Sequence, residues 1–144
     1  DVGGIWVADR VMRMYQSDIE DKKLTMIMPN PCPGPYRTVA ELVNRFRINC
    51  RNVYTFNMDE WADQDGNIAP ESYTLGFMHA FKKYFYSELD DDLRPPESQI
   101  VGPTNANIDD YQKMIDDVGG CDVCYSGPGW TEHCYPAQAY KLTY

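Results

Sequence analysis

Residues 24–46 read LTMIMPNPCPGPYRTVAELVNRF, and this stretch decides the fold. Leu24 to Met28 is a short apolar run bounded by charge on one side and by prolines on the other, which predicts a buried parallel strand. The four prolines between Pro29 and Pro35 are expected to prevent regular structure there. A helix is predicted from about Tyr36, because apolar residues recur at three-to-four spacing on one face: Val39, Leu42, Val43 and Phe46.

The same order of strand, loop and helix recurs along the chain. The opening residues start in the middle of a helical pattern, so we expect a helix there whose beginning is missing. Further strands are predicted at 52–58, 98–102 and 121–126, and further helices at 71–88 and 107–118. The helix over 71–88 is expected to be the longest. Its inner stripe would be Leu75, Met78, Phe81, Phe85 and Leu89, and the inward residues of the helix over 107–118 would be Ile108, Tyr111 and Ile115.

Repeated strand–loop–helix units predict an α/β fold, with a parallel sheet covered by helices on both faces in a Rossmann-like, three-layer arrangement. No internal repeat or linker divides the chain, so residues 1–144 are expected to form a single domain, incomplete at its C-terminus. In such folds, the catalytic and ligand-binding residues lie in loops at the carboxyl ends of the strands. Three loops qualify: Pro29–Pro35, Asp59–Pro70 and Gly127–Pro136.

Composition narrows the possible partners. Lys and Arg number 13 against 22 Asp and Glu, a formal net charge of −9, so the surface as a whole repels nucleic acid and anionic membranes. The first residues lack the pattern of a signal peptide, and every window long enough to span a bilayer is interrupted by charge. We therefore expect a cytoplasmic protein that uses a small-molecule substrate, with a homo-oligomer left open.

The five cysteines are odd in number and irregularly spaced, so they are expected to be free thiols. Cys121 and Cys124 form a Cys-x-x-Cys pair, a pattern found in zinc sites and in redox-active sites. No second such pair exists, and the two lie inside a predicted strand. We therefore expect neither a metal nor another cofactor.

Asp59 and Glu60 follow an apolar strand. At least one of the two carboxylates is expected at the edge of the sheet, partly desolvated and with a raised pKa suited to accepting a proton. The alternatives are an acid in a solvated turn and a cap for the next helix. The residue pattern leaves this choice open.

Residues 127–133 read GPGWTEH, directly after a predicted strand. The glycines Gly127 and Gly129 would let backbone amides approach an anion. His133 lies at the strand end, so it is a candidate for proton transfer, with a structural role as the alternative. In the proline-rich loop, Asn30, Cys32 and Gly34 retain backbone donors.

NVYTFNMDEWADQDGNIAPESY (52–73) and GGCDVCYSGPGWTEH (119–133) together resemble the glucosamine-6-phosphate deaminase/isomerase family. The resemblance runs from about Thr25 to Gln138. It does not extend to the related phosphogluconolactonases, which carry an acid–arginine pair where this chain has Asp59-Glu60-Trp61. Family members are longer, so the chain looks like their amino-terminal portion, with the basic residues that grip a phosphate expected beyond Tyr144.

The resemblance implies aldose–ketose isomerisation and deamination of an amino-sugar phosphate such as glucosamine 6-phosphate, in carbohydrate metabolism. It implies that Asp59 is the base that moves a proton between C2 and C1, and that His133 assists ring opening. Substrate contacts would come from the strand-end loops: Asn30, Cys32, Gly34, Glu60, Gly127, Gly129 and Thr131.

The chain also departs from the family pattern. Thr131 and Gln138 stand where relatives have carboxylates beside the histidine, and Glu132 stands where they have glycine. Glu132 would either replace the missing carboxylate, as a third catalytic residue, or clash with the loop. Residues 31–35 (PCPGP) replace a glycine- and threonine-rich phosphate cradle. A non-catalytic sugar-phosphate-binding or regulatory protein of the same fold, and a truncated product without function, are the alternatives.

Overall fold

The computed structural model describes residues 2–126. Its helices and strands follow one another as α1 (Val2–Glu20), β1 (Leu24–Met28), α2 (Pro33–Phe46), β2 (Val53–Asn57), α3 (Phe77–Tyr84), β3 (Ile100–Val101), α4 (Tyr111–Asp117) and β4 (Val123–Cys124). Short 3₁₀ turns cover Tyr86–Glu88, Glu97–Gln99 and Ile108–Asp110. Among the helices of this part of the chain, none is long and apolar enough to cross a membrane.

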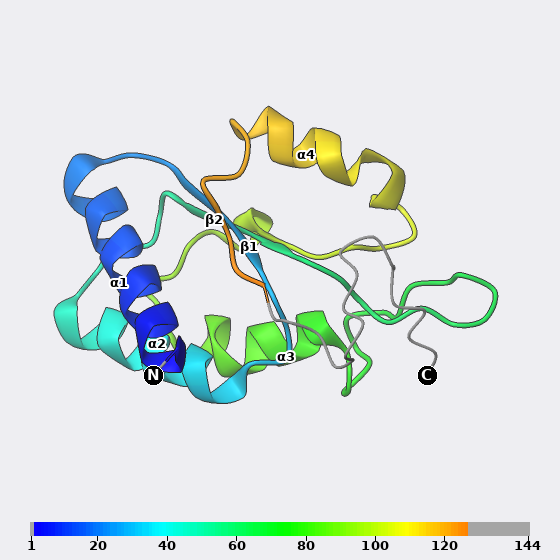
Figure 1. The fold of residues 1–144 in the computed structure, drawn as a ribbon, viewed down its shortest axis with the longest axis horizontal. Helices are drawn as coiled ribbons and strands as arrows, with labels where there is room; N and C mark the ends of the chain where they lie inside the picture. Colours follow the sequence, from blue (N-terminus) through cyan, green and yellow to red (C-terminus); the bar gives the residue numbers. More distant parts are fainter. Residues whose placement is uncertain (1, 127–144) are drawn as a thin grey trace.

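The four strands form one parallel sheet in the order β3-β2-β1-β4. From β1 through β2 to β3 the chain moves across the sheet in one direction, and it then returns past both strands to place β4 beside β1. Right-handed crossovers put α2 and α3 on one face and α4 on the other, and Figure 1 shows α4 across the strands from α1, α2 and α3. The predicted α/β class, with helices on both faces, is confirmed.

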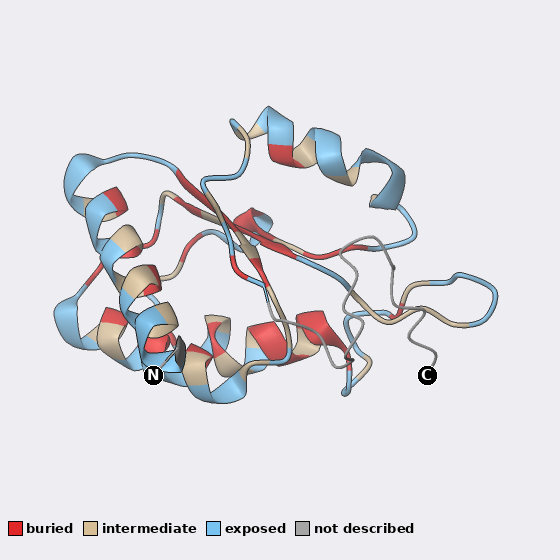
Figure 2. Cartoon of the chain, in the orientation of Figure 1, coloured by how far each residue is buried: buried red, intermediate tan, exposed pale blue. Residues whose placement is uncertain are grey.

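The core lies between the sheet and the helices α1, α2 and α3. β1 is buried at four of its five positions, as expected for a parallel strand covered on both faces, and Figure 2 shows this burial along the central strands. From α2, the side chain of Tyr36 packs edge-on against Phe81 of α3, with ring centroids 5.2 Å apart. This contact packs the first turn of α2 against α3.

The expectation of irregular structure throughout Pro29–Pro35 is wrong at its end, because α2 begins at Pro33. The first backbone N–H groups of a helix have no partner inside the helix, so prolines are tolerated in its first turn. Pro33 and Pro35 occupy such positions. The loop after β1 is therefore only four residues long, from Pro29 to Cys32.

The helix predicted over 71–88 is also shorter than expected. Turns precede α3, which covers Phe77–Tyr84, and the longest described helix is α1. Of the predicted inner stripe, Leu75 lies outside α3 and is 71% exposed, whereas Phe81, Phe85 and Leu89 are buried. In the next helical segment Ile115 is buried as predicted, but Ile108 is 46% exposed, because it falls in the 3₁₀ turn before α4.

Candidate active site at the carboxyl ends of β1 and β2

The return of the chain from β3 to β4 creates a switch point between β1 and β4. In open α/β sheets, ligands bind outside the carboxyl ends of the strands, at such a point. The residues that follow β1 and β2 lie there: the loop Pro29–Cys32 and the segment that begins with Met58 and Asp59. Two of the three predicted site loops therefore meet at one edge of the sheet.

An amide pair joins these two strand ends. Asn30 Nδ2 donates a hydrogen bond to Asn57 Oδ1, at 3.2 Å. Asn57 is fully buried, and its backbone oxygen accepts a hydrogen bond from the Tyr111 hydroxyl at 2.8 Å. Asn30 Oδ1 is buried as well, but it has no hydrogen-bond partner within residues 2–126. A buried acceptor without a partner is unusual and marks a place where a ligand or water can donate.

Asp59 lies two residues beyond the end of β2, and its carboxyl has an altered pKa. The surrounding protein partly desolvates the carboxyl and, with a smaller contribution from the charge of Glu60, raises its pKa to about 6. The residue as a whole is nonetheless exposed, so the desolvation acts on the carboxyl from the surrounding protein while solvent still reaches the side chain. Within residues 2–126 its carboxylate forms no hydrogen bond or ion pair. The predicted raised pKa at the sheet edge is therefore present at Asp59.

Glu60 has a different environment from Asp59. Its Oε1 accepts hydrogen bonds from the backbone nitrogens of Trp61 at 3.0 Å and Phe77 at 2.8 Å, and its Oε2 accepts one from Met78 at 2.8 Å. Glu60 therefore caps the first turn of α3, where free N–H groups and the helix dipole favour a negative charge. The sequence left open which of the two acids is a cap, and the structure answers that it is Glu60. Its contact with substrate stays a prediction.

Cys32 and Gly34, two of the expected substrate contacts, lie at the start of α2. Cys32 is the N-cap residue, and its backbone oxygen accepts a hydrogen bond from the Tyr36 nitrogen at 3.1 Å. Burial raises the pKa of the Cys32 thiol, against the opposing charge of Arg10. The space where Gly34 would carry a Cβ is open within 4 Å. The Tyr36 hydroxyl donates a hydrogen bond to the Pro29 carbonyl, which ties the start of the loop after β1 to α2.

Arg10 of α1 is a residue that the sequence analysis missed. Its side chain is fully buried, and its guanidinium carbon lies over three rings, at 4.0 Å from the centroid of Tyr125, 5.2 Å from Trp6 and 5.6 Å from Tyr36. One nitrogen reaches the Trp6 carbonyl at 3.4 Å, while Nε and Nη2 have no hydrogen-bond partner in the described part. The four-residue spacing from Trp6 through Arg10 to Met14 could have revealed a cation on the inner face of the helix.

Several predicted residues lie outside the described residues. These are Gly127, Gly129, Thr131, Glu132 and His133, so the expected convergence of His133 with Asp59 stays a prediction. Cys121 and Cys124 are exposed free thiols. Within residues 2–126, no group of three or more His, Cys, Asp or Glu side chains is placed to hold a metal ion.

Comparison with known proteins identifies the relatives of this chain, although no family model matches it. A glucosamine-6-phosphate deaminase of Borreliella afzelii is 30% identical over 137 residues, which cover 89% of this chain and 48% of that protein. A glucosamine-6-phosphate deaminase of Phocaeicola vulgatus is 32% identical over 108 residues, covering 69% of this chain and 37% of that protein. The chain thus spans half or less of the length of these curated relatives.

Solved structures extend the likeness to the fold. A monomeric glucosamine-6-phosphate deaminase superposes with a TM-score of 0.62 at 18% identity, over 81% of this chain and 48% of that one. A 6-phosphogluconolactonase of Thermotoga maritima gives 0.61 at 13% identity, over 85% of this chain and 53% of that one. The fold alone therefore does not separate the two groups, whereas both curated relatives described above are deaminases. In sequence this chain is similar to glucosamine-6-phosphate deaminases, as its motifs at 52–73 and 119–133 indicate, and it shares the fold of a solved member.

Proposed function

We propose that this chain forms part of an enzyme that isomerises and deaminates an amino-sugar phosphate such as glucosamine 6-phosphate, with Asp59 as the base. The chain would act as a single domain in cytoplasmic carbohydrate metabolism. The observation that carries the proposal is the contrast between two adjacent acids at the carboxyl end of β2. Glu60 is held by three backbone amides, whereas Asp59 is free of hydrogen bonds from residues 2–126 and has a pKa of about 6.

A base that moves a proton between two carbons of the substrate must first accept it and then return it. A carboxylate with a pKa near 6 is mostly ionised at neutral pH, yet it is more basic than an ordinary aspartate and still gives up its proton readily. Asp59 meets this requirement. Glu60 does not, because protonation would cost it the hydrogen bonds that cap α3.

The substrate contacts follow from the same edge of the sheet. Asn30 Oδ1, buried and without a partner in the described part, would accept a hydrogen bond from a hydroxyl or amino group of the sugar. The open space at Gly34, beside Cys32, would admit the approach of an anionic group to the start of α2. On the family resemblance, the proposal keeps His133 for ring opening with Glu132 beside it, and Gly127, Gly129 and Thr131 for contacts from the loop after β4.

Ammonia release from glucosamine 6-phosphate, together with solvent deuterium exchange at C2, tests the proposal. We expect Asp59→Asn to abolish both, and kcat/KM of the parent protein to rise with pH around a midpoint near 6. The matched control is Glu41→Gln, which neutralises an exposed acid on α2. A folded full-length version of the protein that retains Asp59 and shows neither activity would refute the proposal. Calorimetric binding of the sugar phosphate to it without turnover would favour a non-catalytic binding protein instead.

A further inference from the structure

The guanidinium of Arg10 has one edge without a hydrogen-bond partner. Nε and Nη2 are buried, and neither makes a hydrogen bond within residues 2–126. In this part of the chain Nη1 alone has an acceptor, the Trp6 carbonyl at 3.4 Å. Nε–H and one N–H of Nη2 lie side by side on the same edge of a planar guanidinium and point the same way. This edge is the fork that binds two oxygens of a carboxylate or a phosphate.

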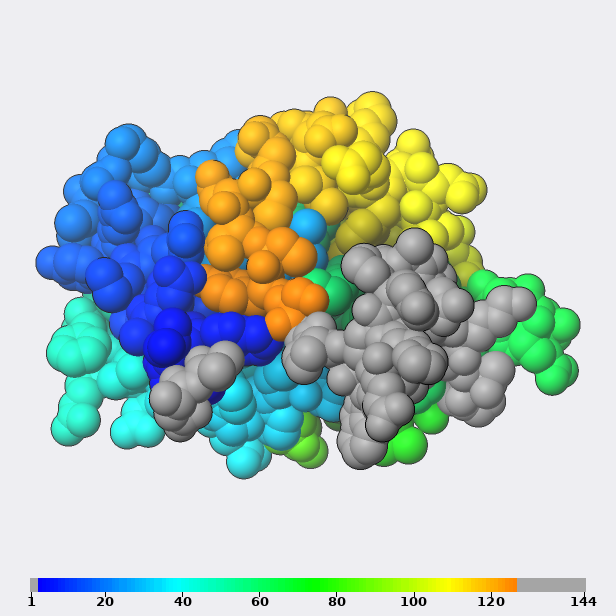
Figure 3. Space-filling model, viewed as in Figure 1, coloured from blue at the N-terminus to red at the C-terminus, as the bar shows by residue number. Residues whose placement is uncertain are grey.

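The aromatic rings around Arg10 hold it without using this fork. The guanidinium carbon lies 4.0 Å from the ring centroid of Tyr125, and Figure 3 shows α1, in dark blue, beside the orange segment around β4. Rings that pack on a guanidinium cover its face, whereas its N–H bonds lie in its plane and need oxygen acceptors. The stacking therefore fixes the position of Arg10 and leaves two of its nitrogens unsatisfied.

The charge of Arg10 also lacks a partner of its own. The nearest carboxylate in the sequence, Asp9, accepts hydrogen bonds at Oδ2 from Arg13 Nε at 2.8 Å and from the Tyr125 hydroxyl at 2.6 Å. One carboxylate thus serves a cluster with two guanidinium groups, which keeps a net positive charge. Burying a charge without a counterion is costly, so an anion bound at the fork would complete the cluster.

The fork lies close to the first turn of α2 and to the proposed base. The guanidinium carbon of Arg10 is 5.6 Å from the ring centroid of Tyr36, and its charge opposes the effect of burial on the pKa of the Cys32 thiol. Burial raises the pKa of Tyr36 as well; there the charge of Arg10 opposes the rise and that of Asp59 adds to it. Arg10 and Asp59 therefore act on the same region of the strand-end edge.

The start of α2 needs a donor from elsewhere if it is to hold an anion. The N-terminus of a helix favours negative charge through its free N–H groups. Here Pro33 and Pro35 have no N–H, and the Tyr36 nitrogen already donates to a backbone oxygen of the preceding loop. Gly34 is left as the donor of this turn. The fork of Arg10 supplies the two donors that the prolines remove.

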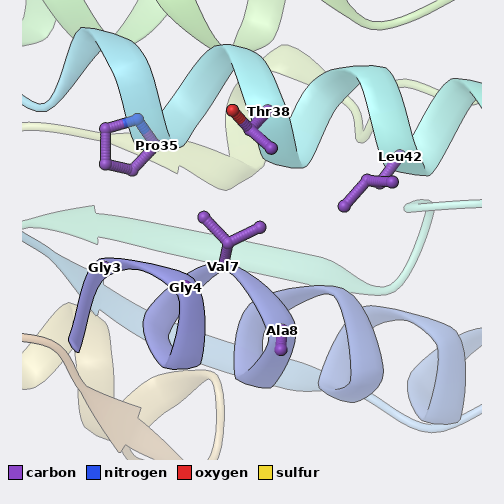
Figure 4. A pocket seen from close by; sticks show the side chains of 7 residues that line it. All are labelled: Gly3, Gly4, Val7, Ala8, Pro35, Thr38 and Leu42. Carbon is purple, nitrogen blue, oxygen red and sulfur yellow. The ribbon is translucent and has the colours of Figure 1, made fainter. Parts of the chain in front are cut away.

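The hollow between α1 and α2 is a different place. It has a volume of about 480 Å³ and reaches Pro35 in the first turn of α2. Figure 4 shows Val7 pointing into it from α1, and none of the residues that line it carries a charge. An apolar lining cannot compensate the charge of an anion, so the hollow does not compete with the fork for such a ligand.

Of the three rings that cover Arg10, Trp6 is the one that can admit a ligand. The hydroxyl groups of Tyr36 and Tyr125 each donate a hydrogen bond within the fold. Trp6 is only partly buried, and its indole nitrogen makes no hydrogen bond within residues 2–126. We propose that the Nε–Nη2 edge of Arg10 binds a phosphate group at the start of α2, and that Trp6 is displaced as the phosphate enters.

Binding of inorganic phosphate to the full-length protein, followed by calorimetry and by tryptophan fluorescence, tests the site. We expect Arg10→Met to weaken binding by about tenfold or more, because charge-assisted bidentate bonds are lost. Arg10→Lys keeps the charge without the fork and should also weaken it. The control Arg45→Met removes the same charge from an exposed position of α2. Thermal melts show whether each variant is folded.

Two outcomes would overturn the site: a parent protein that binds no phosphate at millimolar concentration, and folded Arg10 variants that bind it as tightly as the control. We expect phosphate to change the fluorescence of the parent and to leave that of Trp6→Phe unchanged. An equal change in both proteins would overturn the displacement of Trp6.

Competition identifies the source of the phosphate group. The site follows from the geometry of Arg10, but its assignment to the amino-sugar phosphate rests on the proposed function. Glucosamine 6-phosphate should displace inorganic phosphate and glucosamine should not, and Arg10→Met should raise KM for the sugar phosphate more than it lowers kcat. Phosphate that stays bound in excess glucosamine 6-phosphate would overturn this assignment.

The two proposals fail in different ways. Asp59→Asn should abolish turnover and bind inorganic phosphate as the parent does. A full-length protein without deaminase activity, in which Arg10→Met still weakens phosphate binding, would refute the proposed function and uphold the site. An active protein whose phosphate binding and KM are unchanged by Arg10→Met would refute the site and uphold the function.

Discussion

The carboxylate of Glu60 lies 2.8 Å from the backbone nitrogen of Met78, so the acid that follows Asp59 holds the first turn of α3. Within residues 2–126, one dipeptide thus contributes a carboxylate without hydrogen bonds to the strand end and a hydrogen-bonded one to the next helix. The two are coupled, because the charge of Glu60 contributes to the raised pKa of Asp59.

Replacing Glu60 by glutamine tests this coupling. Glu60→Gln removes the charge and leaves one amide group in place of two acceptor oxygens, so it should lower the free energy of unfolding by about 1–2 kcal/mol, as the loss of a helix cap does. The pKa of Asp59 should fall from about 6 toward its ordinary value. Urea unfolding and an NMR titration of the Asp59 carboxyl measure the two effects. Glu41→Gln serves as control, and a Glu60→Gln variant as stable as that control would contradict the cap.

The pH dependence of stability should report on Asp59. Its pKa is raised to about 6 from the ordinary value of 3.8, so between these pH values the folded state holds the proton more tightly than the unfolded state. Asp59 therefore reduces the free energy of unfolding as the pH rises from about 4 through 6. Asp59→Asn abolishes that loss, and its stability relative to the parent should increase over the same interval. Equal pH profiles for the two proteins in urea titrations would show that the carboxyl is not desolvated.

Substitutions of Arg10 test how much its buried guanidinium contributes to the stability of the fold. Because Nε and Nη2 have no hydrogen-bond partner within residues 2–126, an apolar side chain of similar length should replace it well. Arg10→Met is expected to leave the free energy of unfolding unchanged or to raise it by up to about 2 kcal/mol. Arg10→Ala leaves a cavity among three aromatic rings and should lower it by about 3 kcal/mol. Thermal and chemical unfolding of both variants measure the difference, and a large loss in Arg10→Met would reveal a charge partner.

Two glycines should respond in opposite directions to alanine. A Cβ at Gly76 would lie 2.9 Å from the backbone oxygen of Tyr73, so Gly76→Ala should lower the free energy of unfolding by about 1–2 kcal/mol. A Cβ at Gly34 would meet nothing within 4 Å, in the first turn of α2, and Gly34→Ala should raise stability by about 0.5–1 kcal/mol. The denaturant midpoints of the two variants measure these changes in stability. A stabilised Gly76→Ala variant would contradict the close approach of Gly76 to the Tyr73 backbone oxygen.

Local patterns predicted the sheet well. The strand at Leu24–Met28 was predicted to the residue, because charge and proline bound a continuous apolar run. The strand predicted at 52–58 is observed at Val53–Asn57. The predictions at 98–102 and 121–126 located the other two strands, but each has only two residues, since strand length depends on pairing with a neighbour rather than on composition.

Features that depend on distant residues could not be predicted. The start of α3 is set by a carboxylate 17 residues earlier in the chain, so the apolar spacing that began at Leu75 misplaced the helix. The same long-range contact decides which of Asp59 and Glu60 remains free. For the site, the sequence correctly brought the loops after β1 and β2 to one edge, but it gave no sign of the pair between Asn30 and Asn57.

Tyr111 gives the site a mechanical connection to the opposite face of the sheet. Its hydroxyl lies 2.8 Å from the carbonyl oxygen of Asn57 and 3.3 Å from that of Val101, so one side chain of α4 clasps the ends of β2 and β3. A shift of α4 would pull on both carbonyls at once, and Asp59, two residues further on, would be displaced with them. The position of the Asp59 carboxylate therefore depends on a helix that does not itself contact it.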